Sequence, residues 1–107
     1  MEAWNAHDLN RILALYTPDA RHTSKRVRAL GGENDTLHGK QAIAEYFGLA
    51  LERYPALRFE PISVSTGPRT VAIEYQSQHT GSNEPTLELL ELNGAGLIIH
   101  SRVYHGP

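Results

Sequence analysis

The stretch VAIEYQSQ, residues 71–78, carries the clearest structural pattern of the chain. Apolar and polar side chains alternate along it, which is the period of a β-strand with one buried face. Val71, Ile73 and Tyr75 share one face, whereas the glutamate and glutamines that follow them share the other. An antiparallel sheet commonly covers only one of its faces, so we predict that the apolar set points into the core.

Further strand-like segments lie on both sides of this stretch. Upstream, residues 57–64 alternate in two phases, and Pro61 between the phases indicates a bulge or an edge position. Downstream, residues 86–92 and 97–105 predict two more strands. Turn-forming residues separate the strands at 66–69, 80–85 and 93–96. A run of hairpins of this kind predicts an antiparallel sheet.

The first half of the chain is predicted to supply the helices. Leu9, Ile12, Leu13 and Tyr16 recur at the spacing of one helical face, and Asp8 stands where an N-cap is expected. The expected order is a helix ending at 17–19, a strand at 20–24, an irregular stretch at 25–37 and a helix that follows His38-Gly39 and ends at Pro55. Helices followed by hairpins favour an α+β fold. The residues before Asp8 read as the tail of another helix, so we expect that the N-terminal helix is truncated.

Composition narrows the classes of function. The chain has 107 residues, a net charge of -2 and no cysteine. A negative balance does not favour nucleic-acid binding, and the short basic run at residues 25–28 is interpreted as a solvated loop. Without cysteine there is no disulfide, thiolate nucleophile or Cys-ligated zinc. No long apolar run or signal peptide is visible, so we expect no contact with membranes. The length suits a single domain over residues 1–107, and the absence of cysteine fits a cytoplasmic protein.

Several short motifs together resemble the nuclear transport factor 2-like superfamily, most closely its SnoaL-like and ketosteroid-isomerase-like branches. These motifs are Ala3-Trp4-Asn5-Ala6-His7-Asp8-Leu9, Ile12-Leu13-Ala14-Leu15-Tyr16, Asp19-Ala20, Gly39-Lys40-Gln41-Ala42-Ile43 with Tyr46-Phe47, Leu92-Asn93-Gly94-Ala95-Gly96 and Arg102-Val103-Tyr104. The resemblance implies a curved antiparallel sheet wrapped by N-terminal helices into a cone with an internal pocket, a cystatin-like α+β barrel. It also implies a homodimer formed through the outer sheet face, which would carry Glu74, Gln76, Leu89, Glu91, His100, Arg102 and Tyr104.

Glu88 is the first catalytic candidate. Counted back from the turn at 93–96, it falls where the resembling isomerases carry a buried carboxylic acid that donates a hydrogen bond to a forming oxyanion. A carboxyl group walled by Ile73, Tyr75 and Leu90 would lose hydration, which raises its pKa and keeps it protonated, as in ketosteroid isomerase. The alternative is a glutamate at a strand edge that points into solvent.

The resemblance breaks down at the general base. The carboxylate of the isomerases aligns with Ser24, and serine cannot abstract a proton from carbon without a base of its own. The partner tyrosine of the isomerases would precede Met1, so steroid isomerisation is not favoured. His22 shares a strand face with Ser24 and is the candidate base, because an unperturbed imidazole titrates near pH ~6.5. The alternative is a histidine that is hydrogen-bonded in the pocket wall.

The remaining candidates are the pocket walls. Trp4 and Tyr46 are expected to hold a flat apolar or aromatic ligand, or else only to pack in the core. The substrate-binding set is Trp4, Ser24, Tyr46, Ile73, Tyr75, Leu90, Val103 and His105. The six histidines show no metal-ligand spacing, so neither a metal nor another cofactor is expected. Two functions stay open: a cofactor-independent isomerase, cyclase or lyase acting on an apolar carbonyl compound, and a non-catalytic ligand-binding or dimerisation module.

Overall fold

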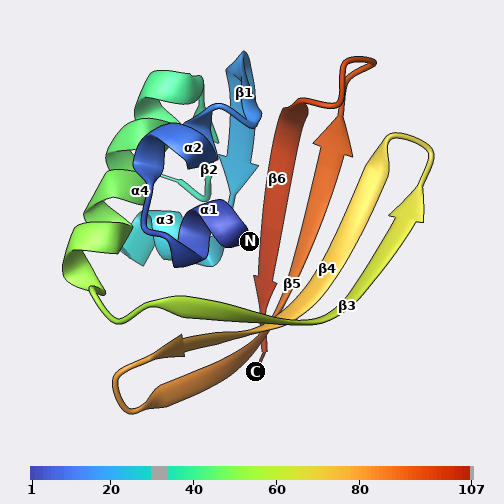
Figure 1. Ribbon diagram of the computed structural model, residues 1–107. Coiled ribbons are helices and arrows are strands. Elements are labelled where there is room, and N and C mark those ends of the chain that lie inside the picture. The colour runs from blue at the N-terminus through green and yellow to red at the C-terminus, as the bar shows by residue number, and fades with distance from the viewer. Residues whose placement is uncertain (30–33, 107) are drawn as a thin grey trace.

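A computed structural model describes residues 1–29 and 34–106. The helices are α1 (Glu2–Asn5), α2 (Leu9–Leu13), α3 (Lys25–Ala29) and α4 (Lys40–Arg53). The strands are β1 (Tyr16–Thr23), β2 (Thr36–His38), β3 (Arg58–Gly67), β4 (Thr70–His79), β5 (Ser82–Leu92) and β6 (Ile98–His105). The predicted α+β class is therefore confirmed. Figure 1 shows the helices gathered on one side of the sheet, with the β3–β4 hairpin extending away from them.

The six strands form one mixed sheet in the order β2-β1-β6-β5-β4-β3. Neighbours from β6 to β3 pair antiparallel, as predicted, and the expected bulge lies between Pro61 and Ser63. The pairing of β1 with β6 is parallel, which the expectation of a purely antiparallel sheet missed. Parallel neighbours need a long connection between them, and here that connection is most of the chain.

The N-terminal half departs from the expected boundaries. The helix ends at Leu13, and the chain is already extended from Tyr16, so Pro18 lies inside β1 and not at a helix end. The pairing register of β1 with β6 is irregular between Tyr16 and Arg21, and a proline without a backbone N–H is tolerated in such an interruption. The stretch expected to be irregular contains α3 and β2. Residues 30–33 of that stretch lie outside the described residues.

Two local features determine where helices α2 and α4 begin. The Asp8 carboxylate accepts a hydrogen bond from the backbone N–H of Arg11 at 3.2 Å, which confirms Asp8 as the N-cap of α2. Gly39 precedes α4 with φ of 91°, a conformation that side chains other than glycine rarely adopt, and its N–H bonds to the carbonyl of Ala20 at 2.8 Å. This bond anchors the start of α4 to β1.

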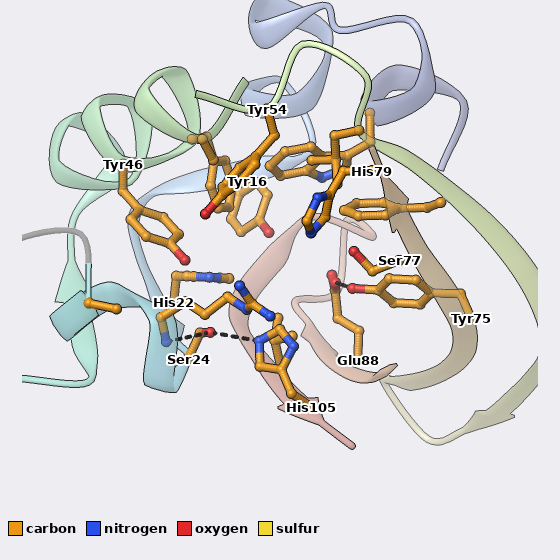
Figure 2. A pocket seen from close by; sticks show the side chains of 18 residues that line it. Tyr16, His22, Ser24, Tyr46, Tyr54, Tyr75, Ser77, His79, Glu88 and His105 are labelled. Atoms are coloured by element: carbon orange, nitrogen blue, oxygen red, sulfur yellow. Dashed lines mark hydrogen bonds between the residues drawn. The ribbon is translucent and has the colours of Figure 1, made fainter. Parts of the chain in front are cut away.

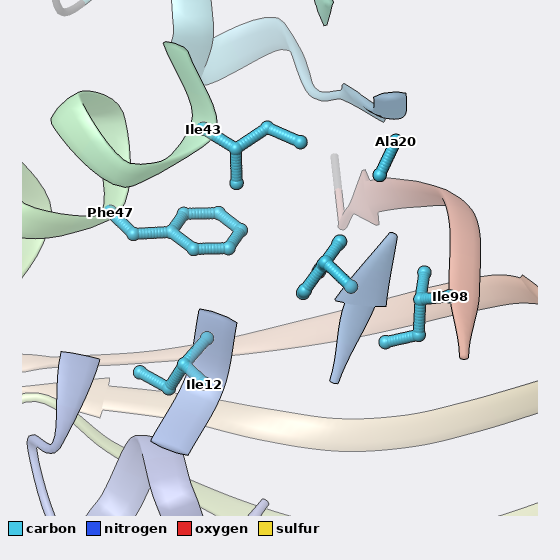
Figure 3. Packing of buried hydrophobic residues seen from close by; sticks show 6 residues of the cluster. Ile12, Ala20, Ile43, Phe47 and Ile98 are labelled. Atoms are coloured by element: carbon cyan, nitrogen blue, oxygen red, sulfur yellow. The ribbon is translucent and has the colours of Figure 1, made fainter. Parts of the chain in front are cut away.

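The core lies between α2, α4 and the strands β1 and β6. Ile43 and Phe47 lie four residues apart on α4 and are at most 1% exposed, so one helical face supplies both. Figure 3 shows them facing Ile12, Ala20 and Ile98. In residues 1–29 and 34–106, no helix is both long and apolar enough to cross a bilayer.

The Asn5 side chain joins α1 to β3 by hydrogen bonds. Asn5 donates from Nδ2 to the carbonyl of Phe59 at 2.9 Å, and its Oδ1 accepts from the Phe59 N–H at 2.7 Å. Trp4 therefore lies over Phe47 and Phe59, with ring centroids 4.8 and 5.4 Å away. This packing places the Trp4 ring against side chains of both α4 and β3.

Candidate active site

A cavity of about 120 Å³ lies between the helices and the inner face of the sheet (Figure 2). Eight of the ten predicted site residues line it: Trp4, His22, Ser24, Tyr46, Tyr75, Glu88, Val103 and His105. Ile73 and Leu90 do not. Ile73 lies on the inner face, cross-strand from Glu88, and Leu90 packs against the core cluster. The strand parity was therefore correct, but the cavity ends before these two side chains.

Aromatic rings form much of the cavity wall. Phe59 and Tyr75 lie with centroids 4.7 Å apart, and Tyr54 packs on His79 at 5.0 Å. Tyr46 faces the cavity from α4. Burial raises the pKa of the Tyr46 phenol, an effect that nearby Ser24 and Arg26 partly offset. The hydroxyl of Tyr46 is therefore protonated at neutral pH and can donate a hydrogen bond.

Glu88 points into the cavity from β5. The Tyr75 hydroxyl donates to Glu88 Oε1 at 3.0 Å, and Oε2 has no hydrogen-bond partner among the described residues. Burial raises the pKa of the Glu88 carboxyl, and the hydrogen bond from Tyr75 lowers it by less. The structure thus has the Glu88 carboxyl facing inward, and not pointing into solvent as the alternative interpretation had it.

His22 lies on β1, in the wall of the same cavity. Its Nδ1 is 2.7 Å from Ser101 Oγ, and that oxygen accepts a hydrogen bond from the Tyr16 hydroxyl at 3.0 Å. Because Tyr16 donates to Ser101, the serine proton is free to point at Nδ1, which leaves the imidazole proton on Nε2. The ring also packs edge-on against Phe47 with centroids 4.9 Å apart.

The surroundings of His22 suppress its charge. Burial above all, and then the nearby His100 and His105, lower the pKa of His22 to about 3. Protonating this ring at neutral pH would cost about 5 kcal/mol. His22 is thus a neutral hydrogen-bonding group at physiological pH.

A second polar group in the cavity wall consists of Ser24 and His105. Ser24 Oγ is 3.3 Å from His105 Nε2, and His105 Nδ1 is 2.9 Å from Glu84 Oε1, although not aligned as a linear hydrogen bond. The Arg26 guanidinium pairs with the other Glu84 oxygen. Burial lowers the pKa of His105, and the neighbouring Arg26 also acts in that direction.

Sequence reasoning missed Glu84 and Arg26. Arg26 was interpreted as part of a solvated loop, but it lies on α3 and lines the cavity. Glu84 was placed in a turn, but β5 begins at Ser82. The alternation of Glu84, Thr86 and Glu88 continues the strand pattern upstream and could have indicated that Glu84 faces inward.

No metal site emerges from the part of the chain that the structure describes: none of its histidine, aspartate and glutamate side chains form a group of three placed to hold an ion. What remains is a cavity with three kinds of polar group. These are a carboxyl with a raised pKa, a neutral imidazole and a serine beside a second imidazole. Such a set can exchange protons and donate hydrogen bonds.

A family model and a solved structure both relate the chain to SnoaL-like proteins. Residues 1–99 match the family model of the SnoaL-like domain, and no curated protein matches the chain. A SnoaL-like protein of unknown function from Burkholderia thailandensis has a similar structure, with 28% identity and a TM-score of 0.89 over 99% of this chain and 87% of that chain.

Two more distant structures share the fold alone. One is a candidate polyketide cyclase from Sinorhizobium meliloti, at 15% identity and a TM-score of 0.78 over 96% of this chain and 87% of that chain. The other is a candidate ketosteroid isomerase from Kribbella flavida, at 12% identity and a TM-score of 0.79 over 99% of this chain and 71% of that chain.

Proposed function

Because the chain belongs to the SnoaL-like domain family, we propose that it is a cofactor-independent enzyme that moves protons on a small, apolar carbonyl compound. The family resemblance of the sequence is thereby confirmed; the activity is our proposal. The observation that carries it is the Glu88 carboxyl, which faces the cavity, has a raised pKa and has one oxygen without a hydrogen-bond partner in residues 1–29 and 34–106. Structural neighbours described as a candidate isomerase and a candidate polyketide cyclase are consistent with chemistry of this class.

The two candidate groups exchange the roles expected from the sequence. Burial raises the pKa of the Glu88 carboxyl, which makes its carboxylate a stronger proton acceptor, and lowers the pKa of the His22 imidazole to about 3, which makes the imidazole a weak one. An acid–base catalyst works best when its pKa lies near the operating pH. Glu88 is therefore the proton-exchanging group, and His22 serves as a hydrogen-bond donor through Nε2.

The proposed reaction follows from these roles. The Glu88 carboxylate removes a proton from the carbon next to the substrate carbonyl, and the charge moves onto the carbonyl oxygen. The Nε2–H of neutral His22 and the hydroxyl of Tyr46 are the donors available for that oxygen, and fixed donors of this kind stabilise a developing oxyanion. Glu88 then returns the proton to another atom of the substrate, while Tyr75 holds the carboxyl in place.

The cavity limits the class of substrate. At about 10–15 Å³ for each enclosed water, 120 Å³ holds on the order of ten water-sized groups, which suits a molecule of one or two rings. The aromatic wall of Phe59, Tyr75 and Tyr46 favours a flat apolar body. Cyclic ketones and enones fit this description.

Deuterium exchange tests the proposal directly. Cyclic ketones and enones are incubated with the protein in heavy water, and NMR follows loss of the proton next to the carbonyl. We expect enzyme-dependent exchange that Glu88→Gln reduces by at least about 100-fold, the lower end of what a positioned acid–base group contributes. Glu52→Gln, which makes the same chemical change at an exposed position on α4, should leave exchange unchanged.

A thermal-shift measurement on the same compounds separates catalysis from binding. A ligand at about 100 times its Kd stabilises the fold by about 2.7 kcal/mol, which is readily detected. Stabilisation without exchange would contradict the enzymatic proposal and favour the non-catalytic ligand-binding module. Exchange that survives in Glu88→Gln would show that Glu88 is not the proton-exchanging group.

We also propose that two copies pair through the outer sheet face. Leu87 and Tyr104 lie opposite each other on β5 and β6 and are 43% and 51% exposed. Beside them, the Arg102 guanidinium pairs with Glu91, so charges flank an apolar centre, as is common at protein interfaces. Sedimentation should give a dimer for the unmodified chain and a monomer for Tyr104→Glu. A monomeric unmodified chain would contradict this assembly.

A further inference from the structure

We propose that Ser24 is a nucleophile activated by His105 and that the cavity carries out acyl transfer from small aryl esters. This activity is separate from proton exchange at Glu88. Ser24 Oγ is 3.3 Å from His105 Nε2, and His105 Nδ1 is 2.9 Å from Glu84 Oε1. A hydroxyl, an imidazole and a carboxylate in this order are the parts that nucleophilic catalysis requires, with distances often looser when no substrate is bound.

The hydrogen bonds of Ser24 leave its proton available. The backbone N–H of Arg26 donates to Ser24 Oγ at 3.2 Å, so this oxygen already acts as an acceptor. Its proton can then be directed at His105 Nε2, which lies 3.3 Å from Ser24 Oγ. An attacking serine needs this same arrangement, because its proton leaves toward the base.

Contacts at Nδ1 orient His105 as the base for Ser24. His105 Nδ1 lies 2.9 Å from Glu84 Oε1 without the alignment of a hydrogen bond, and we assign the ring proton to Nδ1, beside the carboxylate, so that Nε2 is the acceptor. The Arg26 guanidinium pairs with the second oxygen of Glu84 and so fixes the carboxylate. The His105 side chain is 8% exposed, so the ring is enclosed by protein. Burial favours the neutral ring, the form that can accept a proton.

The nucleophile faces space that a substrate can occupy. Ser24, His105 and Tyr46 all line the cavity, although these residues come from separate parts of the chain (Figure 2). The Tyr46 phenol lies close enough to Ser24 for the serine to influence its pKa. We assign this hydroxyl as the donor to the oxygen of an attacked carbonyl.

Hydrolysis of an aryl ester at Ser24 requires water as the only co-reactant. Ser24 Oγ bonds to the ester carbonyl carbon while its proton passes to His105 Nε2, which gives a tetrahedral oxyanion. Collapse of this intermediate breaks the bond to the leaving phenol, which takes the proton from His105. Water then attacks the acyl-serine, gives a proton to His105 and releases the carboxylic acid as Ser24 regains its proton.

The test uses p-nitrophenyl acetate with the full chain. We expect a burst of nitrophenolate followed by slower turnover, together with an acetyl group on Ser24 found by peptide mass spectrometry after an acid quench. Ser24→Asn removes the hydroxyl but keeps a side-chain oxygen that can cap α3, so it separates the nucleophile from the fold. Ser24→Asn and His105→Gln should each lower the acylation rate by at least about 100-fold.

Two further variants sharpen the result. Glu84 is a positioning residue, so Glu84→Gln should lower kcat and leave KM unchanged, because it acts only through His105. Ser65→Ala, at an exposed serine on β3, should match the unmodified protein. Acetylation only at other residues, or full hydrolysis by folded Ser24→Asn, would overturn the proposal. Neither result depends on whether Glu88 exchanges protons with a ketone.

Discussion

Acidification from about pH 7 to about pH 5 should lower the free energy of unfolding by about 2 kcal/mol through His22 alone. In the folded chain the pKa of this imidazole is about 3, against an ordinary value of 6.5. Between these values the unfolded chain binds a proton that the folded chain does not. The stabilisation is therefore complete above pH 6.5 and is lost as the pH falls. Over the whole interval it amounts to about 5 kcal/mol.

Other groups in the cavity also titrate, so a variant is needed to isolate His22. The pKa values of His100 and His105 are also lowered, which adds to the acid sensitivity, whereas the raised pKa of Glu88 acts in the opposite direction. Urea denaturation at both pH values should show a smaller loss for His22→Gln than for the unmodified chain. The difference should be about 2 kcal/mol.

NMR titration of the imidazole provides an independent check that requires no substitution. The ring resonances of His22 should stay those of a neutral imidazole down to about pH 4. A midpoint near the ordinary value, or equal losses of stability in His22→Gln and the unmodified chain, would refute the burial of a neutral ring. In that event His22 would again qualify as the base that the sequence suggested.

Four further substitutions probe the fold and the site. Phe47→Ala should cost about 3–5 kcal/mol in urea denaturation, because the ring is buried against Trp4, Tyr16 and His22. Ionising the buried Glu88 carboxyl is unfavourable, so raising the pH through its raised pKa should destabilise the unmodified chain but not Glu88→Gln. Calorimetry of both proteins over a pH series measures this difference. Gly39→Ala should lose about 1–2 kcal/mol in thermal unfolding because of its positive φ. Asp8→Ala should lose about 1 kcal/mol in the same measurement, through loss of the N-cap of α2.

Local patterns predicted helices and strands correctly where apolar side chains recurred with a clear period. The alternation around Tyr75 identified β4 and its inner face, and the helix expected ahead of Pro55 is α4. The same reasoning failed at Tyr16, which fits the apolar spacing of a helix but lies in β1. Tyr16 is buried in both readings, so burial alone could not distinguish them. Its strand state depends on pairing with Ile98, far along the chain.

The candidate site was predictable only in part, for the same reason. Strand parity and the family resemblance placed Glu88, His22 and His105 on inner faces. The contact of His105 with Glu84 depends on how β5 and β6 are staggered, and the contact of Ser24 with His105 depends on the parallel pairing of β1 with β6. Nor does the residue sequence around His22 give its pKa, because the cause is desolvation by side chains from other elements.

The parallel pairing of β1 with β6 has a consequence for the order in which the molecule forms. Hairpins between neighbouring strands close short loops, whereas β1 meets β6 only after some eighty residues of chain have been gathered, as in the contact of His22 with Ser101. Contacts so distant in sequence are slow to form because the entropy of closing the loop must be overcome first. The polar contacts that His22 and Ser24 make with β6 should therefore be absent from a folding intermediate that already contains β3 to β6. Pulsed hydrogen exchange should detect this as late protection of the β1 amides.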